Sequence, residues 1–277
     1  MAIIERPVIV GVDGSPAALG AVRWAADEAV RLRRPLRVTH ALGVPGPSEE
    51  ITDEQGLVLN AAVEARHWYP GLRVTTSTWY GRPAHVLREQ SRHAELVVVG
   101  SRGHGGLHSL FVGSVGMHLA RHAQCPVLVV HHAERWAGPE SQLPSGPPVV
   151  VGADGSAGAL TVMEAAFGEA SARRVPLVAV RVWQPPSSRL VRRTDPDNLA
   201  AELDADLERL RAKDPAVEVE IRVRQGATVP VLLYEARDAL MIVLGAHGLS
   251  GLTGMRLGAV TQHVLEHADT PVLVVRH

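Results

Sequence analysis

Pro7-Val8-Ile9-Val10-Gly11-Val12-Asp13-Gly14-Ser15 returns in the second half of the chain as Pro148-Val149-Val150-Val151-Gly152-Ala153-Asp154-Gly155-Ser156. Each copy is a short run of branched apolar residues that ends in aspartate, glycine and serine. Such a run predicts a strand buried on both faces, followed by a tight turn. Because the order of residues agrees in both places, we predict that the chain contains the same domain twice.

Later positions repeat in the same order. Gly81, Gly100, Gly103, Gly113 and Pro126 correspond to Gly226, Gly245, Gly248, Gly258 and Pro271. The stretch between the copies is rich in glycine, proline and serine, a composition typical of an irregular connector. We therefore predict a first domain over residues 1–132, a linker over 133–147 and a second domain over 148–277.

Short apolar runs alternate with longer helical patterns in each copy, as in a parallel sheet covered by helices. Strands are expected at 8–12, 36–42, 72–79, 96–99 and 127–130, and helices at 16–33, 52–68, 83–93 and 114–122. Ser15 is a predicted N-cap with Pro16 at the first helical position. The prediction is an α/β fold of two tandem Rossmann-like, doubly wound domains, each a five-stranded parallel sheet flanked by helices. The ligand is expected at the carboxyl ends of the strands.

A glycine-rich loop follows the fourth predicted strand. Gly100-Ser101-Arg102-Gly103 is followed, after nine residues, by Gly113-Ser114 at the start of a predicted helix. Glycines let backbone amides approach an anion, and a helix N-terminus adds unpaired N–H groups and positive partial charge. The Ser114 hydroxyl can add a donor, and Arg102 or His104 can offset phosphate charge. This spacing predicts a site for a polyphosphate.

The second copy keeps the glycines but changes the residues between them. It reads Gly245-Ala246-His247-Gly248, then nine residues, then Gly258-Ala259. Ala259 lacks the hydroxyl of Ser114, and one neutral hydrogen bond contributes about 0.5–1.5 kcal/mol net. We therefore expect two sites of unequal affinity, the second weaker.

The Gly-x2-Gly-x9-Gly-[Ser/Thr] loop, the Gly-x-Asp-Gly-Ser opening and the closing Cys-Pro-Val-Leu-Val-Val resemble the ATP-binding universal stress proteins, over nearly the whole chain and twice. The resemblance implies that the aspartate lies near the sugar and base, that backbone after the second strand holds the adenine, and that the loop wraps the phosphates. The implied contacts are Val12, Asp13, Ala41, Val99, Gly100, Arg102, Gly103, Gly113, Ser114 and Val115 in the first copy, and Ala153, Asp154, Val182, Leu244, Gly245, His247, Gly248, Gly258, Ala259 and Val260 in the second. Ala259 departs from the family pattern. The resemblance also implies an internal pseudo-dimer of the two halves and leaves a homodimer open.

Two groups of residues have alternative interpretations. Asp13 and Asp154 either close Asx turns ahead of their helices or take part in binding, through a ribose hydroxyl or a magnesium ion. His118 with His122, like His263 with His267, shares a helix face as zinc ligands do, but no matching carboxylate or cysteine set accompanies them. We interpret these histidines as a solvated helix face and predict no metal ligands.

The composition of the chain argues against two classes of partner, nucleic acids and membranes. The formal charge is −1 and aromatic residues make up 4%, which favours neither binding to nucleic acid by bulk charge nor base stacking. No apolar run approaches the length of a membrane span, and the N-terminus does not read as a signal peptide. We expect a cytoplasmic protein with no membrane or nucleic-acid partner. Cys125, the single cysteine, is expected to be a buried thiol.

Catalytic motifs are missing from the sequence. It contains no Gly-x4-Gly-Lys-[Ser/Thr] pattern, no Gly-x-Ser-x-Gly elbow and no His-Glu-x-x-His, and its one lysine, Lys213, is far from both glycine loops. We expect an ATP-binding stress-response regulator or sensor, with or without Mg²⁺, that is not an enzyme and that signals to an unknown protein partner. One alternative is a slow ATPase or nucleotide-processing enzyme that uses Asp13 or Asp154. Another is a structural interaction protein with degenerate sites.

Overall fold

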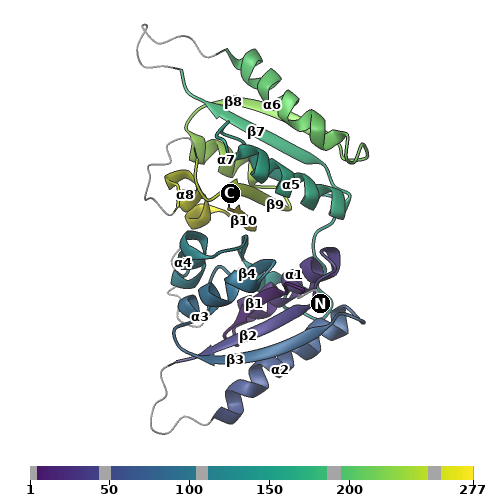
Figure 1. Ribbon diagram of the computed structural model, residues 1–277, viewed down its shortest axis with the longest axis vertical. Helices are drawn as coiled ribbons and strands as arrows, with labels where there is room; N and C mark the ends of the chain where they lie inside the picture. Colours follow the sequence, from purple (N-terminus) through teal and green to yellow (C-terminus); the bar gives the residue numbers. More distant parts are fainter. Residues whose placement is uncertain (1–4, 44–50, 104–111, 186–194, 249–256, 277) are drawn as a thin grey trace. The chain divides into compact units, whose positions relative to one another are not determined.

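The structure is a computed structural model that describes residues 5–43, 51–103, 112–185, 195–248 and 257–276, with the side chains of 51–55 left out. The chain divides into two units, Met1–Leu143 and Pro144–His277. Each unit has its own parallel sheet with helices packed on it (Figure 1).

The first unit is built around a central strand whose side chains are buried on both faces. Its strands are β1 (Val8–Val12), β2 (Leu36–Leu42), β3 (Val74–Tyr80), β4 (Leu96–Gly100) and β5 (Val127–Val130), in the spatial order β3-β2-β1-β4-β5. All neighbouring pairs are parallel, and Val10 of β1 lies opposite Val38 of β2 and Val98 of β4. Val8, Ile9 and Val10 are fully buried, because helices cover both faces of a parallel sheet.

Helices of the first unit pack in two pairs. They are α1 (Pro16–Arg31), α2 (Ile51–Trp68), α3 (Pro83–Gln90) and α4 (Ser114–His122), with the 3₁₀ turns η1 (Ser91–His93) and η2 (Ala133–Trp136). α1 contacts α2, and α3 contacts α4. Figure 1 shows the two pairs on opposite faces of the sheet.

The second unit repeats this arrangement. Its elements are β6 (Val149–Gly152), α5 (Ala159–Arg173), β7 (Leu177–Trp183), α6 (Pro196–Arg211), β8 (Val219–Gln225), α7 (Thr228–Ala236), β9 (Met241–Gly245), α8 (Ala259–His267) and β10 (Val272–Val275). The strands are parallel in the order β10-β9-β6-β7-β8. β6 therefore takes the central place that β1 has in the first unit. The predicted fold class, two tandem doubly wound α/β domains, is confirmed.

The first helices of the two units begin differently. In the first unit Ser15 Oγ accepts the Ala18 N–H at 3.1 Å and Pro16 occupies the first turn, as predicted. The second unit has no proline at this place, and α5 begins only at Ala159 after an N-cap glycine without a side chain. Proline sets the helical φ in advance and serine supplies the first acceptor, so the first unit starts its helix sooner.

The beginning of the predicted linker packs on the first unit. Arg23 of α1 donates hydrogen bonds to the carbonyl oxygens of Gly138 at 2.8 Å, Pro139 at 3.3 Å and Ser141. Trp24 and Trp136 meet edge to face, with their ring centroids 5.4 Å apart. Residues between 133 and 141 are thus packed on α1, and the division between the units falls at Leu143 and Pro144.

This packing explains a glycine in the middle of a helix. A Cβ atom on Gly20 of α1 would collide with the carbonyl group of Ala133. Gly168 of α5 is exposed, and a Cβ atom there would meet nothing within 4 Å. Gly20→Ala should therefore destabilise the first unit by about 1–3 kcal/mol, as overpacking does. Gly168→Ala should stabilise the second by about 0.5–1 kcal/mol, because alanine favours helix more than glycine does.

Urea unfolding followed by circular dichroism measures both changes. If Gly20→Ala were stabilising like Gly168→Ala, the close approach of Ala133 to α1 would be wrong.

Candidate functional site

The strand order creates a crevice at the carboxyl end of each sheet. β1 lies between β2 and β4, so the connections that leave β1 and β4 run to opposite faces of the sheet, and ligands bind at such a switch point in open α/β sheets. A cavity of about 320 Å³ lies there in the first unit. A cavity of about 400 Å³ lies at the corresponding place in the second.

Every residue predicted from the sequence lines one of these cavities. In the first unit they are Val12, Asp13, Ala41, Val99, Gly100, Arg102, Gly103, Gly113, Ser114 and Val115. In the second they are Ala153, Asp154, Val182, Leu244, Gly245, His247, Gly248, Gly258, Ala259 and Val260. The structure thus brings each set together, while contact of these residues with a nucleotide stays a prediction.

Backbone hydrogen bonds hold the two ends of the glycine loop together. The Gly113 N–H donates to the Ser101 carbonyl at 2.7 Å, and the Ser101 N–H donates to Val130 of β5 at 2.9 Å. In the second unit the Gly258 N–H donates to the Ala246 carbonyl, also at 2.7 Å. These bonds fix the first glycines beside the helix start. His104, a second candidate for offsetting phosphate charge, lies outside the described residues.

The helices at the cavities begin without a side-chain cap. α4 has Gly113 as its N-cap and α8 has Gly258, and a glycine N-cap has no side chain that could bond the first amides. The first amides of a helix have no partner inside the helix. The first residues of α4 and α8, Ser114, Val115, Ala259 and Val260, line the cavities. Amides at such a helix start can bind an anion.

Asp13 both closes a turn and approaches the glycine loop. Its Oδ1 accepts hydrogen bonds from the Ser15 N–H at 3.0 Å and the Ser15 hydroxyl at 2.6 Å. Its Oδ2 lies so close to Gly103 that a Cβ atom on this glycine would collide with it. The Asx turn is therefore present, and the same carboxylate also lines the cavity.

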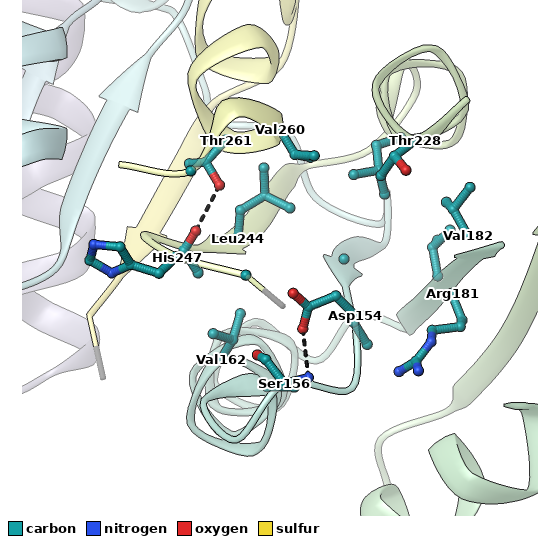
Figure 2. Close-up of a pocket in the computed structure, with 18 of the residues that line it drawn as sticks. Asp154, Ser156, Val162, Arg181, Val182, Thr228, Leu244, His247, Val260 and Thr261 are labelled. Atoms are coloured by element: carbon teal, nitrogen blue, oxygen red, sulfur yellow. Dashed lines mark hydrogen bonds between the residues drawn. The ribbon is translucent and has the colours of Figure 1, made fainter. Parts of the chain in front are cut away.

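Asp154 has the same two contacts in the second unit. It accepts a hydrogen bond from the Ser156 N–H at 2.9 Å, which Figure 2 marks with a dashed line. A Cβ atom on Gly248 would lie 2.6 Å from Asp154 Oδ2. In both units the second glycine of the loop thus leaves room for the aspartate that follows the central strand.

The second cavity differs from the first mainly in its polar groups. Ser114, Ser101 and Arg102 are replaced there by Ala259, Ala246 and His247. Thr261, at the place of Gly116, donates its hydroxyl to the Gly245 carbonyl at 2.7 Å (Figure 2). Among the residues of the two glycine loops that the structure describes, the second loop therefore has fewer side-chain donors for an anion than the first.

Sequence reasoning missed the side chains that precede the predicted adenine contacts. His40 lies before Ala41, and its Nδ1 is 2.7 Å from the carbonyl oxygen of Val12. Arg181 occupies the corresponding place before Val182 and lines the second cavity. The sequence did show a polar residue near the end of each of these buried strands. It could not show that the side chain lines the cavity, because the direction of the side chain depends on the turn packed beside it.

The histidine pairs differ between the units. His263 and His267 are exposed, and their Nδ1 atoms lie 2.7 and 2.8 Å from carbonyl oxygens one turn earlier. The prediction of a solvated face is confirmed there. It is wrong for His118, which is half-buried between the rings of His85 and His122, with centroids 5.2 and 4.5 Å away.

Burial, together with the nearby His85, Arg88 and Arg121, lowers the pKa of His118 below its ordinary value. Among the described residues no three His, Cys, Asp or Glu side chains are grouped as a metal site would need. The histidine cluster is therefore interpreted as packing between α3 and α4.

Cys125 is buried, as expected. No helix in the described part of the chain combines the length and the apolar character needed to cross a membrane.

The close approach of Asp13 to Gly103 can be tested by a double-mutant cycle. Gly103→Ala alone should destabilise the first unit, because the added methyl group displaces the Asp13 carboxylate. With Asp13→Ala present the same change should destabilise less, and the coupling free energy should reach about 1 kcal/mol or more. Gly103 does not have a positive φ, so backbone strain does not confound the cycle. Urea unfolding of the four proteins measures the coupling, and strictly additive effects would contradict this geometry.

Comparison with known proteins agrees with this architecture. A model of the universal stress protein family matches residues 5–131 and again residues 147–276. The chain is 35% identical over 292 residues to a universal stress protein of Mycolicibacterium smegmatis, with 98% of this chain and 97% of that protein covered.

Solved structures with this fold also match the chain. A crystal structure of a universal stress protein from Archaeoglobus fulgidus, 17% identical, covers 98% of this chain and 96% of its own with a TM-score of 0.69. A universal stress protein from the same organism, solved in complex with dAMP, is 24% identical over 46% of this chain and 98% of its own, with a TM-score of 0.39. Since the family model matches both halves, the chain belongs to the universal stress protein family and contains its domain twice.

Proposed function

We propose that each unit binds an adenine nucleotide, with ATP as the principal ligand, and that the protein acts as a nucleotide-dependent stress-response regulator or sensor. The observation that carries the proposal is the cavity at the carboxyl end of each sheet, where an uncapped helix N-terminus meets a glycine loop. Backbone amides in that arrangement bind phosphate without a side-chain cation.

The shape and lining of the cavities suit a nucleotide. Their volumes of about 320 and 400 Å³ fall in the range of small-molecule sites. Apolar side chains such as Val12, Val99 and Leu87 in the first unit can contact a base. The phosphates would lie at the start of α4, and the base would lie toward the end of β2.

Among the described residues, the lining of each cavity contains one carboxylate. Asp13 and Asp154 each have one oxygen bonded in the Asx turn, and each directs the other toward the glycine loop. Such an oxygen can accept a hydrogen bond from a ribose hydroxyl. It can also hold Mg²⁺ together with phosphate oxygens, since Mg²⁺ is commonly bound by one or two carboxylates and the substrate phosphates. Titrations with and without Mg²⁺ separate the two roles.

Binding without rapid hydrolysis is the proposed activity. Neither lining contains a lysine, and the carboxylates are partly engaged in turns. A slow ATPase that uses Asp13 is the alternative, and it requires turnover that Asp13→Ala abolishes. An interaction protein with degenerate sites is less favoured, because both cavities are open. The internal pseudo-dimer, the cytoplasmic location and the unknown protein partner remain predictions.

Blocking one helix start at a time should remove one bound nucleotide. Gly113→Asp and Gly258→Asp each place a carboxylate where the phosphates are expected. Both positions have negative φ, and a Cβ atom would have its nearest neighbours at 3.3 and 3.6 Å, so the fold should tolerate them. Calorimetry with ATP should give two sites for the parent protein, one for each variant and none for the double variant.

Gly168→Asp adds the same charge at an exposed helical position with open space around it, and it should keep both sites. Undiminished ATP binding by the double variant would refute the proposal.

Swapping the residues at the two helix starts should reduce the difference in ATP affinity between the two sites. Ser114→Ala should weaken ATP binding in the first unit, and Ala259→Ser should strengthen it in the second. One hydroxyl donor contributes about 0.5–1.5 kcal/mol, which corresponds to about 2- to 13-fold in Kd. Each change is measured with the other site blocked by its glycine-to-aspartate variant. Equal affinities in all these proteins would show that the hydroxyl does not contact the ligand.

A further inference from the structure

The two cavities have their arginine side chains at opposite ends. In the first cavity Arg102 lies on the glycine loop, and the corresponding residue of the second cavity is His247. In the second cavity Arg181 lies near the end of β7, and the corresponding residue of the first is His40. Among the described lining residues, the arginine thus lies on the glycine loop in the first unit and near the end of the second strand in the second unit.

The guanidinium group of Arg181 rests on the turn that follows Asp154. A Cβ atom on Gly155 would lie only 2.7 Å from Arg181 Cζ, and Gly155 has φ +75°. In the first unit the corresponding Gly14, with φ +84°, is covered instead by the side chain of Leu57, 2.9 Å from such a Cβ atom. One turn is thus covered by a guanidinium group and the other by an apolar side chain.

Arg181 is half-buried, and within the part of the chain that the structure describes it makes no hydrogen bond or ion pair. His40, by contrast, is held to the carbonyl oxygen of Val12. A guanidinium group has five N–H donors and pairs best with a planar carboxylate or a phosphate. Its place in the lining of the cavity indicates that an anionic ligand group is its partner.

The positions of His247, Asp154 and Arg181 in the cavity indicate which part of the ligand would carry the anionic group. Figure 2 shows Asp154 between His247, on the side of the glycine loop, and Arg181 on the other side. If the 5′ phosphates lie at the start of α8, as the proposed function has it, the sugar lies near Asp154. Arg181 then faces the sugar rather than the end of the phosphate chain.

We propose that the second site selects adenine nucleotides that carry a phosphate on the sugar in addition to the 5′ phosphate, and that Arg181 is the residue that determines this specificity. The first site, with Arg102 on its glycine loop, selects the 5′ polyphosphate chain. This inference rests on the proposed function, because it uses the same orientation of the nucleotide.

ADP and adenosine 3′,5′-bisphosphate provide the test, because they have the same base and two phosphates at different positions. The second site is titrated by calorimetry in the full chain with Gly113→Asp blocking the first. The bisphosphate should bind more tightly than ADP. Arg181→Met, which keeps an unbranched apolar stem but removes the guanidinium group, should weaken binding of the bisphosphate about 10- to 100-fold, as expected for a hydrogen bond to a charged group.

Binding of ADP should change by less than about threefold, since its phosphates lie away from Arg181. Arg181→Lys should retain part of the preference, because it keeps the charge without the fork of donors. In the converse experiment Gly258→Asp blocks the second site. The first site should then prefer ADP, and Arg102→Met should reduce that preference.

Several outcomes would overturn the inference. Equal weakening of ADP and the bisphosphate by Arg181→Met would mean that Arg181 stacks on the base or supports the turn. An unchanged preference would mean that it does not contact the sugar phosphate. If in either case ATP bound the first site of the Gly258→Asp protein, in which that site is intact, the proposed function would stand and this inference alone would fail. Absence of all nucleotide binding by the folded parent protein would refute both. Should Arg181→Met fail to fold, Arg181→His, which installs the residue of the first unit, repeats the test.

Discussion

The close approach of the aspartate after each central strand to the second glycine of the loop is the constraint on which the rest of each site depends. Asp13 follows β1 and Gly103 follows β4, and these strands are neighbours in the sheet. The carboxylate occupies the space that a side chain at Gly103 would need. Because the glycine loop is positioned against the aspartate, the start of α4 lies at the same crevice, and its first residues line the cavity.

The two units satisfy this constraint with the same backbone and with different side chains. Asp154 and Gly248 repeat the contact, and both glycine loops are closed by an amide-to-carbonyl hydrogen bond of 2.7 Å. What varies is the charge and the donors around the cavity, most clearly at Arg102 and Arg181. The duplicated domain thus keeps the same cavity and the same glycine-loop backbone, while the charged side chains that line the two cavities diverge.

Local sequence patterns predicted the elements around the first site but not the packing of the segment after β5. The apolar run predicted the strand Val8–Val12 to the residue, and Ser15 with Pro16 predicted the start of the next helix, which ends at Arg31, two residues earlier than expected. The 3₁₀ turn at Ala133–Trp136 was expected to be linker, because glycines and prolines dominate the stretch around it. Its packing depends on Arg23 and Trp24, more than a hundred residues earlier, and no local pattern contains that information.

From the sequence alone came the repeat, the parallel sheets and the glycine loops, whereas the contact residues came from the family resemblance and omitted His40 and Arg181. The repeat, the sheets and the loops follow from short-range patterns, since strand burial, helix starts and glycine spacing are encoded by neighbouring residues. Only the tertiary structure decided that Oδ2 of Asp13 meets Gly103, that Leu57 covers one turn while Arg181 covers the other, and that His118 is half-buried. The physical reason is that side-chain direction and burial depend on what packs from distant parts of the chain.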